Sequence, residues 1–290
     1  MTKILTNEES KILVTPIKSQ GKKTKLVEWI KETMNDMDIK NDTFIEPFVG
    51  TGAVGFNLDF GKAIFSDNNM HLINFYNDLK FNNINAQIVK EFLYENGKIL
   101  KESKDGNYYY DVRNRFNKNP NSLDFLFLSR AAFNGMMRFN KKGGFNVPFC
   151  KKPERYSQTM ITKISNQVFW LQNKIRNNDW VFKVSDFRSI LNENKNKKNV
   201  IYYLDAPYIL RHGDYYNAWT EEDELDLYTL LKKQEGKFVL STWYGNKHRN
   251  NPYIQNFWKD FEIKTTEHTY HVGAKEVNRN KIIEALVLKK

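Results

Sequence analysis

The residues best suited to chemistry occupy positions 202–208, where the sequence is YYLDAPY. A β-branched and aromatic run predicts a buried strand that ends at Asp205. The amino group of a base is a poor nucleophile because its lone pair is delocalised into the ring, and Asp205 with the backbone carbonyl of Ala206 would draw its hydrogens out of plane. Pro207 keeps Ala206 extended, and Tyr208 suits stacking on an extruded base. The structural alternative is an ordinary strand end that turns at the proline.

A second group of residues suits a nucleotide-like cofactor. Residues 43–46 predict a short buried strand, and the loop EPFVGTG (46–52) follows, in which Gly50 and Gly52 let the backbone approach a ligand. Asp67 ends the next predicted strand about 20 residues later, where a carboxylate accepts hydrogen bonds from ribose hydroxyls. The alternatives are a glycine turn that only packs a helix on a strand, and an Asp67 that caps the helix beginning near Asn69.

The elements that must position these residues follow an α/β order. A helix is predicted over residues 26–34, and strands alternate with helical or polar stretches along most of the chain. The later strands are predicted at 180–186, 199–205, 237–242 and 281–289, with a helix at 225–234. Successive strand ends then meet at one crevice, as in doubly wound, Rossmann-like folds with a mostly parallel twisted sheet flanked by helices.

Residues 81–160 interrupt this order with polar, aromatic and helical stretches, among them KEFLYENGKIL and YYYDVRNRF. They end in the glycine-bearing segment RFNKKGGFNVPF. The sequence therefore predicts one domain formed by residues 1–80 and 161–290, with a mainly helical domain inserted at 81–160.

Composition favours a polyanionic partner. The 290 residues include 45 Lys and Arg against 34 Asp and Glu, a net charge of +11, with 14% aromatic residues. Basic and stacking groups together are typical of nucleic-acid binding, although a Lys- and Asn-rich proteome produces the same bias.

Cysteine and histidine content argues against other classes. One cysteine, Cys150, excludes a disulfide framework and a Cys-based zinc site, and the five histidines form no H-x-x-x-H pair. The first residues are charged, and no apolar run reaches the roughly 18 residues of a membrane-spanning helix. We therefore expect a cytoplasmic, metal-free protein without a membrane segment.

Together with PIKSQGK at 16–22 and SDF at 185–187, these motifs resemble the Dam-type (D12 class) adenine-specific DNA methyltransferases along nearly the whole chain. Their order resembles the alpha arrangement of that family, in which the cofactor region precedes the recognition region and the catalytic motif. The resemblance implies a Rossmann-like methyltransferase fold with an inserted DNA-recognition domain, S-adenosylmethionine as cofactor and double-stranded DNA as partner. The sequence does not determine the oligomeric state, and a monomer is favoured. It is greatest to EcoRV-type modification methylases, which implies a GATATC site and a cognate restriction endonuclease.

The resemblance also assigns cofactor roles. It places Lys18, Gly21 and Lys22 at the methionine portion, Asp67 at the ribose, and Asp186 with Phe187 at the adenine ring. Carboxylates suit ribose hydroxyls and an adenine amino group, and an aromatic ring suits a ring face. The complete set expected at the cofactor is Lys18, Gly21, Lys22, Glu46, Phe48, Gly50, Gly52, Asp67, Asn68, Asp186 and Phe187.

Segments 126–140 and 143–149 match the part of the family that lies against DNA. Arginine pairs with guanine and asparagine with adenine in the major groove, although many such residues contact phosphate or only satisfy the fold. The residues expected at DNA are Arg130, Asn134, Arg138, Asn140 and Asn146 in these segments, Tyr216, Asn217 and Trp219 in a loop that closes over the flipped base, and Lys275 and Arg279 near the last strand. A solvated basic loop is the alternative for the last two.

The sequence departs from the family at one important position, because Ala206 stands where the family has the first of two prolines. The acceptor carbonyl remains, but the fixed φ of proline is lost. A weakened enzyme or a silent DNA-binding homologue is therefore an alternative, as is a methyltransferase acting on RNA or on a protein amide. Cytosine-ring methylation is disfavoured because it requires a nucleophilic cysteine, whereas Cys150 lies beside the recognition segment.

Overall fold

The computed structural model describes residues 12–39, 42–209, 219–269 and 281–290. Within them one seven-stranded sheet has the order β3-β2-β1-β4-β5-β7-β6. The strands are β1 (Thr43–Glu46), β2 (Lys62–Asp67), β3 (Asp179–Val184), β4 (Val200–Leu204), β5 (Lys237–Asn246), β6 (Glu262–Thr269) and β7 (Lys281–Lys289). Strand β7 runs antiparallel to both of its neighbours, and the pairs among β1 to β5 are parallel. The predicted mostly parallel α/β fold is confirmed.

Strand β4 lies in the middle of the sheet and every one of its side chains is buried. Because side chains alternate between the two faces of a strand, Ile201 and Tyr203 join one hydrophobic cluster and Tyr202 and Leu204 join the other. Burial on both faces explains the nearly continuous apolar sequence of this strand. It also places Asp205 at the end of a fully buried strand.

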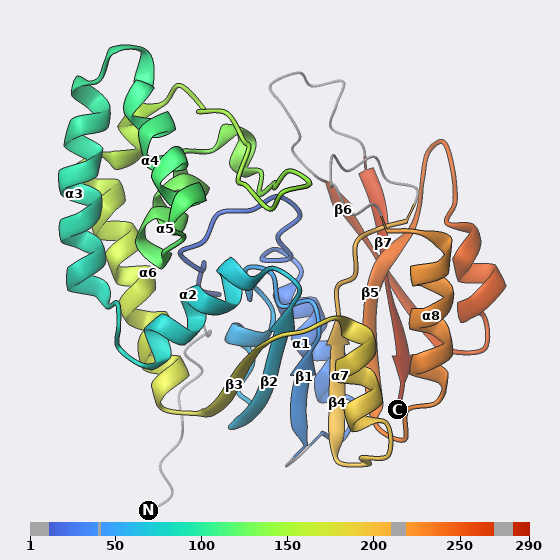
Figure 1. The fold of residues 1–290 in the computed structure, drawn as a ribbon. Coiled ribbons are helices and arrows are strands. Elements are labelled where there is room, and N and C mark those ends of the chain that lie inside the picture. The colour runs from blue at the N-terminus through green and yellow to red at the C-terminus, as the bar shows by residue number, and fades with distance from the viewer. Residues whose placement is uncertain (1–11, 40–41, 210–218, 270–280) are drawn as a thin grey trace, which may run out of the picture.

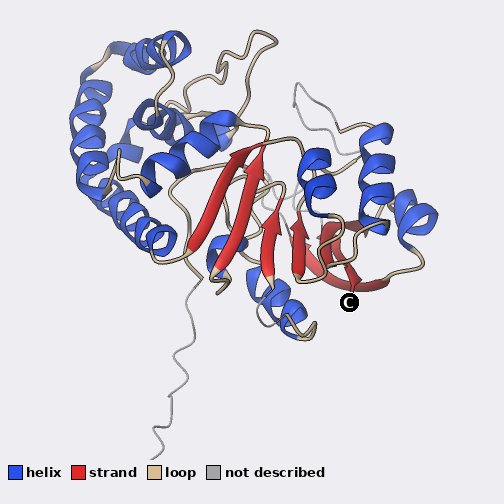
Figure 2. Ribbon diagram, turned by 60° about the horizontal axis from the view of Figure 1, so that its bottom comes forward, coloured by secondary structure: helices blue, strands red, loops and turns tan. Residues whose placement is uncertain are grey.

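Helices cover both faces of the sheet. Helices α7 (Phe187–Asn194) and α8 (Glu221–Lys232) pack on one face through the cluster that contains Leu204, and α1 (Val27–Asn35) lies on the other face (Figures 1 and 2). Helix α2 (Met70–Lys80) follows β2. Its N-cap is Asn69, whose side chain accepts a hydrogen bond from the His71 amide. No described helix is long and apolar enough to cross a membrane.

The remaining helices gather beside β3 at one end of the sheet (Figures 1 and 2). They are α3 (Ala86–Glu102), α4 (Asn107–Lys118), α5 (Ser122–Ala131) and α6 (Gln158–Arg176). Between α5 and α6 the chain is irregular except for short 3-10 turns and the isolated bridges Ala132↔Phe149 and Phe139↔Phe145. Helix α6 continues past residue 160 to the start of β3, and a single hydrophobic cluster extends from these helices into the sheet. The helical part therefore shares its core with the sheet.

The strand predictions for β1, β2, β3, β4, β5 and β7 are confirmed within a few residues, but β6 was not anticipated. Strand β6 is an edge strand in which every residue except Ile263 is polar or charged, and none of its described side chains is buried. An edge strand without a buried face lacks the hydrophobic pattern by which strands are recognised.

Candidate active site

Four acidic side chains stand at the carboxyl edge of the sheet. Glu46 and Asp67 are the last residues of β1 and β2, whereas Asp186 and Asp205 follow β3 and β4 by one or two residues. These strands are parallel neighbours, and Figure 2 shows their arrowheads pointing the same way. The carboxyl edge of the sheet thus brings together the predicted cofactor and catalytic acids.

The glycine loop after β1 is tied to Asp67. The Gly50 amide donates a 2.9 Å hydrogen bond to Asp67 Oδ2, and the Tyr76 hydroxyl donates to the Gly50 carbonyl at 2.7 Å. Gly52 has φ +66°, and a Cβ there would lie 2.0 Å from the Phe56 ring, so this position requires glycine. The cap of α2 is Asn69, whose amide bonds Asp67 Oδ1 at 2.9 Å. Asp67 therefore orients the loop and does not cap the helix.

Glu46 is a buried acid at the start of the same loop. It is 2% exposed, and its Oε2 has no hydrogen-bond partner among the described residues. Burial, followed by the charge of Asp205, raises the pKa of Glu46 well above its ordinary value, and burial also raises the pKa of Asp67. These acceptors fit a ligand that carries hydroxyl, amino or ammonium groups, since a buried oxygen without a partner is unfavourable.

Lys23 contacts the predicted catalytic acid. Its Nζ lies 2.8 Å from Asp205 Oδ1 and 4.6 Å from the centroid of the Tyr208 ring, and its side chain is only 5% exposed. Burial raises the pKa of Asp205, Lys23 opposes this effect, and Glu284 adds to it. The sequence analysis did not select Lys23 and had selected the adjacent Lys22 instead.

Lys22 points elsewhere, because its Nζ donates to the carbonyl of Ile17. Burial, with the nearby charges of Arg130 and Lys18, lowers the pKa of Lys22 to about 8. Both lysines lie outside regular helix and strand, where periodicity gives no indication of side-chain direction. Only the three-dimensional structure distinguishes them.

Within the catalytic motif, Ala206 is 7% exposed and belongs to the cluster under α7 and α8, whereas Pro207 is exposed. The Tyr208 hydroxyl donates a 2.5 Å hydrogen bond to Glu284 Oε2 on β7. The Trp243 indole donates to the Ile209 carbonyl at 3.2 Å, which anchors the chain after the motif to β5.

Three aromatic rings pack together beside the glycine loop. Phe187 lies 5.3 Å from both Phe48 and Trp219, and the Trp219 indole donates to Glu224 Oε2 at 2.7 Å. Phe187 is only 4% exposed, so little of its ring is open to a ligand such as adenine. Trp219, which was expected to lie over a flipped base, instead packs against Phe48 and Phe187, both expected at the cofactor.

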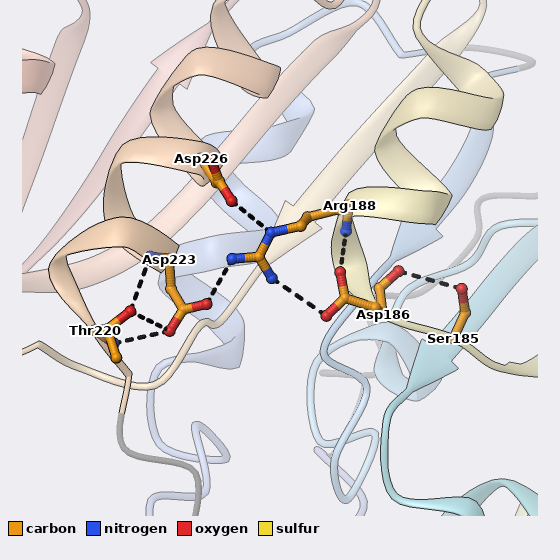
Figure 3. A network of polar contacts seen from close by, with 6 residues as sticks. All are labelled: Ser185, Asp186, Arg188, Thr220, Asp223 and Asp226. Atoms are coloured by element: carbon orange, nitrogen blue, oxygen red, sulfur yellow. Dashed lines mark hydrogen bonds and ion pairs between the residues drawn. The ribbon is translucent and has the colours of Figure 1, made fainter.

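Arg188 connects this corner to α8, as Figure 3 shows. Asp186 caps α7 by accepting from the Arg188 amide at 2.8 Å, and its second oxygen lies 3.4 Å from Arg188 Nη1. The same guanidinium bonds Asp223 and Asp226, at 2.6 Å each. Asp223 in turn forms the capping box of α8 with Thr220. One arginine thus orients Asp186 and attaches α7 to the start of α8.

The N-terminal loop also reaches the helical part. A Cβ on Gly135 would lie 3.0 Å from Cε of Lys18, so the lysine chain packs on this glycine, and Arg130 Nη1 donates to the Pro16 carbonyl at 3.3 Å. Burial lowers the pKa of both Lys18 and Arg130. Arg130 therefore holds the N-terminal loop, and this structural contact differs from the DNA contact expected of it. Gly21 is exposed with φ +72°.

Four more residues expected at DNA lie in the irregular segment between α5 and α6: Asn134, Arg138, Asn140 and Asn146. Arg138 Nε donates to Asn146 Oδ1 at 3.0 Å, and Asn140 Oδ1 accepts from the amides of Lys142 and Gly144. Asn134 is exposed with φ 51°. Asn140 therefore shapes a turn, and Arg138 and Asn146 form a pair at the surface of the segment.

Asn68 is exposed next to Asp67. Tyr216, Asn217, Lys275 and Arg279 lie outside the described residues. Cys150 is half-buried and packs against the main hydrophobic cluster.

Comparison with known proteins identifies the family of this site. The profile of the D12 class N6 adenine-specific DNA methyltransferases matches residues 19–272. The chain belongs to this family. The predicted resemblance to the D12 class is thereby confirmed. The family is one of adenine-specific DNA methyltransferases, which implies DNA as substrate and a methyl donor of the S-adenosylmethionine type.

Individual relatives agree with this assignment. Type II methyltransferase M1.LlaDCHI of Lactococcus lactis subsp. cremoris is 29% identical over 97% of this chain and 97% of that protein. Type II methyltransferase M.MjaIII of Methanocaldococcus jannaschii is 30% identical over 94% of this chain and 97% of its own length. DNA adenine methylase of Vibrio cholerae is 39% identical over 47% of this chain and 48% of its own length.

Replacing Lys23 with Met is expected to shift the pH dependence of methyl transfer. An ionised Asp205 is the useful acceptor, so activity is lost as the pH falls through the pKa of Asp205, which burial has raised and Lys23 lowers. Without the ammonium this pKa rises, and the acidic midpoint of kcat moves to higher pH. The check is kcat against pH for Lys23→Met, with the exposed Lys25→Met as control. A midpoint that stays in place or moves to lower pH would contradict the role of Lys23.

Replacing Arg188 with Met is expected to loosen the junction between α7 and α8. The network is partly exposed, so the loss of unfolding free energy should be about 1 kcal/mol, or a few degrees in Tm. Because Asp186 also loses its orientation, affinity for the methyl donor should fall about tenfold. Thermal unfolding and calorimetric binding measure the two effects. Lys183→Met, which removes the exposed Lys183–Glu193 pair, is the matched control and should change neither. Equal behaviour of both variants would argue against the network.

Proposed function

We propose that this protein transfers the methyl group of S-adenosylmethionine to the exocyclic N6 of an adenine flipped out of a duplex site that contains GAT, with GATATC as the specific site. We further propose that it protects this site against a partner restriction endonuclease. The observation that carries the proposal is the Asp205 carboxylate, held 2.8 Å from Lys23 at the end of β4, beside the Asp67-anchored glycine loop of β1.

The acids at the sheet edge would hold the cofactor. Asp67, oriented by two backbone amides, would accept hydrogen bonds from the ribose hydroxyls. Asp186 would accept a hydrogen bond from the amino group of the cofactor adenine. The unpartnered Oε2 of Glu46 offers a further acceptor next to the glycine loop. S-adenosylmethionine supplies an electrophilic methyl group on a sulfonium, so the protein has to orient the acceptor nitrogen and keep water out. The backbone near Gly50 and Gly52 leaves the space for a close approach.

The catalytic motif would prepare the target nitrogen. Asp205 and the Ala206 carbonyl would accept the two amino hydrogens and so turn the nitrogen lone pair away from the ring. Tyr208 would stack on the extruded base. A nitrogen–carbon bond forms as the sulfur–carbon bond breaks in line, and the proton that the nitrogen then releases passes to Asp205. Lys23 keeps Asp205 ionised, as this step requires.

Target recognition would belong to residues 81–160, and cofactor binding and catalysis to residues 1–80 and 161–290. The exposed Asn134 and the paired Arg138 and Asn146 are the described side chains best placed for base contacts. The net charge of +11 would support binding to phosphates. Two relatives named type II methyltransferases support a role in restriction and modification.

A direct test is transfer of a labelled methyl group from S-adenosylmethionine to duplexes that contain GATATC, GATC or a scrambled site. Transfer confined to GATATC is expected. Asp205→Ala should lose at least about a hundredfold in kcat, because an acceptor made in the transition state is gone, and should keep its affinity for the cofactor. Transfer to GATC alone would reject the specificity, and equal loss of cofactor binding and activity would reject the role of Asp205.

Ala206 motivates a second candidate, a DNA-binding homologue with little catalytic activity. Its carbonyl is still available, but without a proline ring the acceptor is less well fixed. Ala206→Pro is expected to raise kcat by up to about a hundredfold, while binding of DNA and cofactor changes little. The measurement is single-turnover transfer alongside binding of both ligands. If the wild-type protein transfers methyl groups and Ala206→Pro does so at the same rate, the protein is not a homologue with little catalytic activity.

A further inference from the structure

Glu284 is an acid in an otherwise apolar position. It lies near the middle of β7, opposite Trp243 of β5 and Thr266 of β6, and is 0% exposed. Four buried apolar residues, Ala285 to Leu288, follow it along the strand. The hydrophobic pattern of β7 alone would place an aliphatic side chain there.

The contacts of Glu284 do not compensate for the free-energy cost of burying its carboxylate. Its Oε1 has no hydrogen-bond partner, and no lysine, arginine or histidine of the described ranges forms an ion pair with it. Among the described residues, its Oε2 accepts a 2.5 Å hydrogen bond from the Tyr208 hydroxyl. A buried carboxylate with one neutral donor destabilises a fold relative to a hydrophobic residue of similar volume.

We infer that Glu284 is a positioning residue for methyl transfer, one that holds the Tyr208 ring beside Asp205 by accepting a hydrogen bond from its hydroxyl across the sheet from β7. The inference rests on the proposed function, since it takes Tyr208 as the stacking surface for the target base. It adds a residue on β7, about 80 positions along the chain from the catalytic motif.

The contacts around Tyr208 show what this bond restrains. The ring is held at its hydroxyl by Glu284, and the Lys23 ammonium lies 4.6 Å from its centroid. Lys23 also bonds Asp205, so the ring and the acceptor carboxylate share one neighbour. Tilting of the ring would therefore disturb both the stacking surface and the ion pair, and small displacements of catalytic groups reduce rates strongly.

Two substitutions separate the hydrogen bond from the charge. Glu284→Gln and Glu284→Leu both remove the negative charge, but only glutamine keeps an oxygen that accepts the tyrosine hydroxyl. We expect Glu284→Gln to keep kcat within about threefold of the wild type, and Glu284→Leu to lose between about tenfold and a hundredfold. KM for S-adenosylmethionine should be unchanged in both, since Asp67 and Asp186 do not contact β7. Equal losses in the two variants, or none in Glu284→Leu, would overturn the inference.

Tyr208→Phe keeps the aromatic ring but removes the hydroxyl, so it should lose as much kcat as Glu284→Leu. If Glu284 acts through that hydroxyl, the double variant with Glu284→Leu should be no slower than Tyr208→Phe alone. Wild-type kcat in Tyr208→Phe, or additive losses in the double variant, would overturn the inference even if Glu284→Leu folds poorly.

Thermal unfolding of wild type, Glu284→Leu, Tyr208→Phe and their double variant measures the contact without any activity. Nonadditive changes in Tm support the bond, and strictly additive changes overturn it. This readout keeps the inference distinct from the proposed methyl transfer, which fails if the wild-type protein transfers no methyl group to any duplex.

Discussion

The crowding of buried and half-buried carboxylates near one edge of a parallel sheet is the constraint on which the rest of the site depends. Glu46, Asp67 and Asp205 lie at or just after strand ends, and Glu284 approaches from the antiparallel β7. Such a concentration of acids is unfavourable in a protein interior unless other groups share the charge. The structure meets this demand with backbone amides at Asp67, the ammonium of Lys23 at Asp205 and the hydroxyl of Tyr208 at Glu284. The acids are consequently fixed in direction.

The same constraint explains why the site needs support from distant segments. Lys23 comes from the N-terminal loop, Glu284 from the last strand and Arg188 from α7, yet each contacts a residue that closely follows the end of a parallel strand, β3 or β4. Parallel strands bring their ends together but cannot supply these partners themselves. A site assembled this way is rigid only when the whole sheet is formed. This dependence joins the stability of the fold to the geometry required for methyl transfer.

The sequence predicted the parts of this arrangement that follow from periodicity and strand ends. The continuous apolar pattern of β4 located Asp205, and the glycine loop with the following strand located Asp67. Partners across the sheet were beyond reach, because Glu284 stands in an ordinary β pattern and only its register with β5 places it near Tyr208. Lys23 was missed for a related reason, since side-chain direction in a loop has no periodic signal. Arg130 carried a DNA-contact expectation, but its guanidinium holds the N-terminal loop through Pro16.

The N-terminal loop ties the two halves of the proposed function together. Lys23 faces the acids of the sheet, whereas Lys18 packs against Gly135 in the segment expected to contact DNA. Neighbouring cations and burial lower the pKa of Lys18, so it lies in a basic environment only five residues from a lysine in an acidic one. The acidic side suits a cationic methyl donor, and the basic side suits a phosphate backbone. One short loop therefore contacts both the acids at the end of the sheet and the segment expected at DNA.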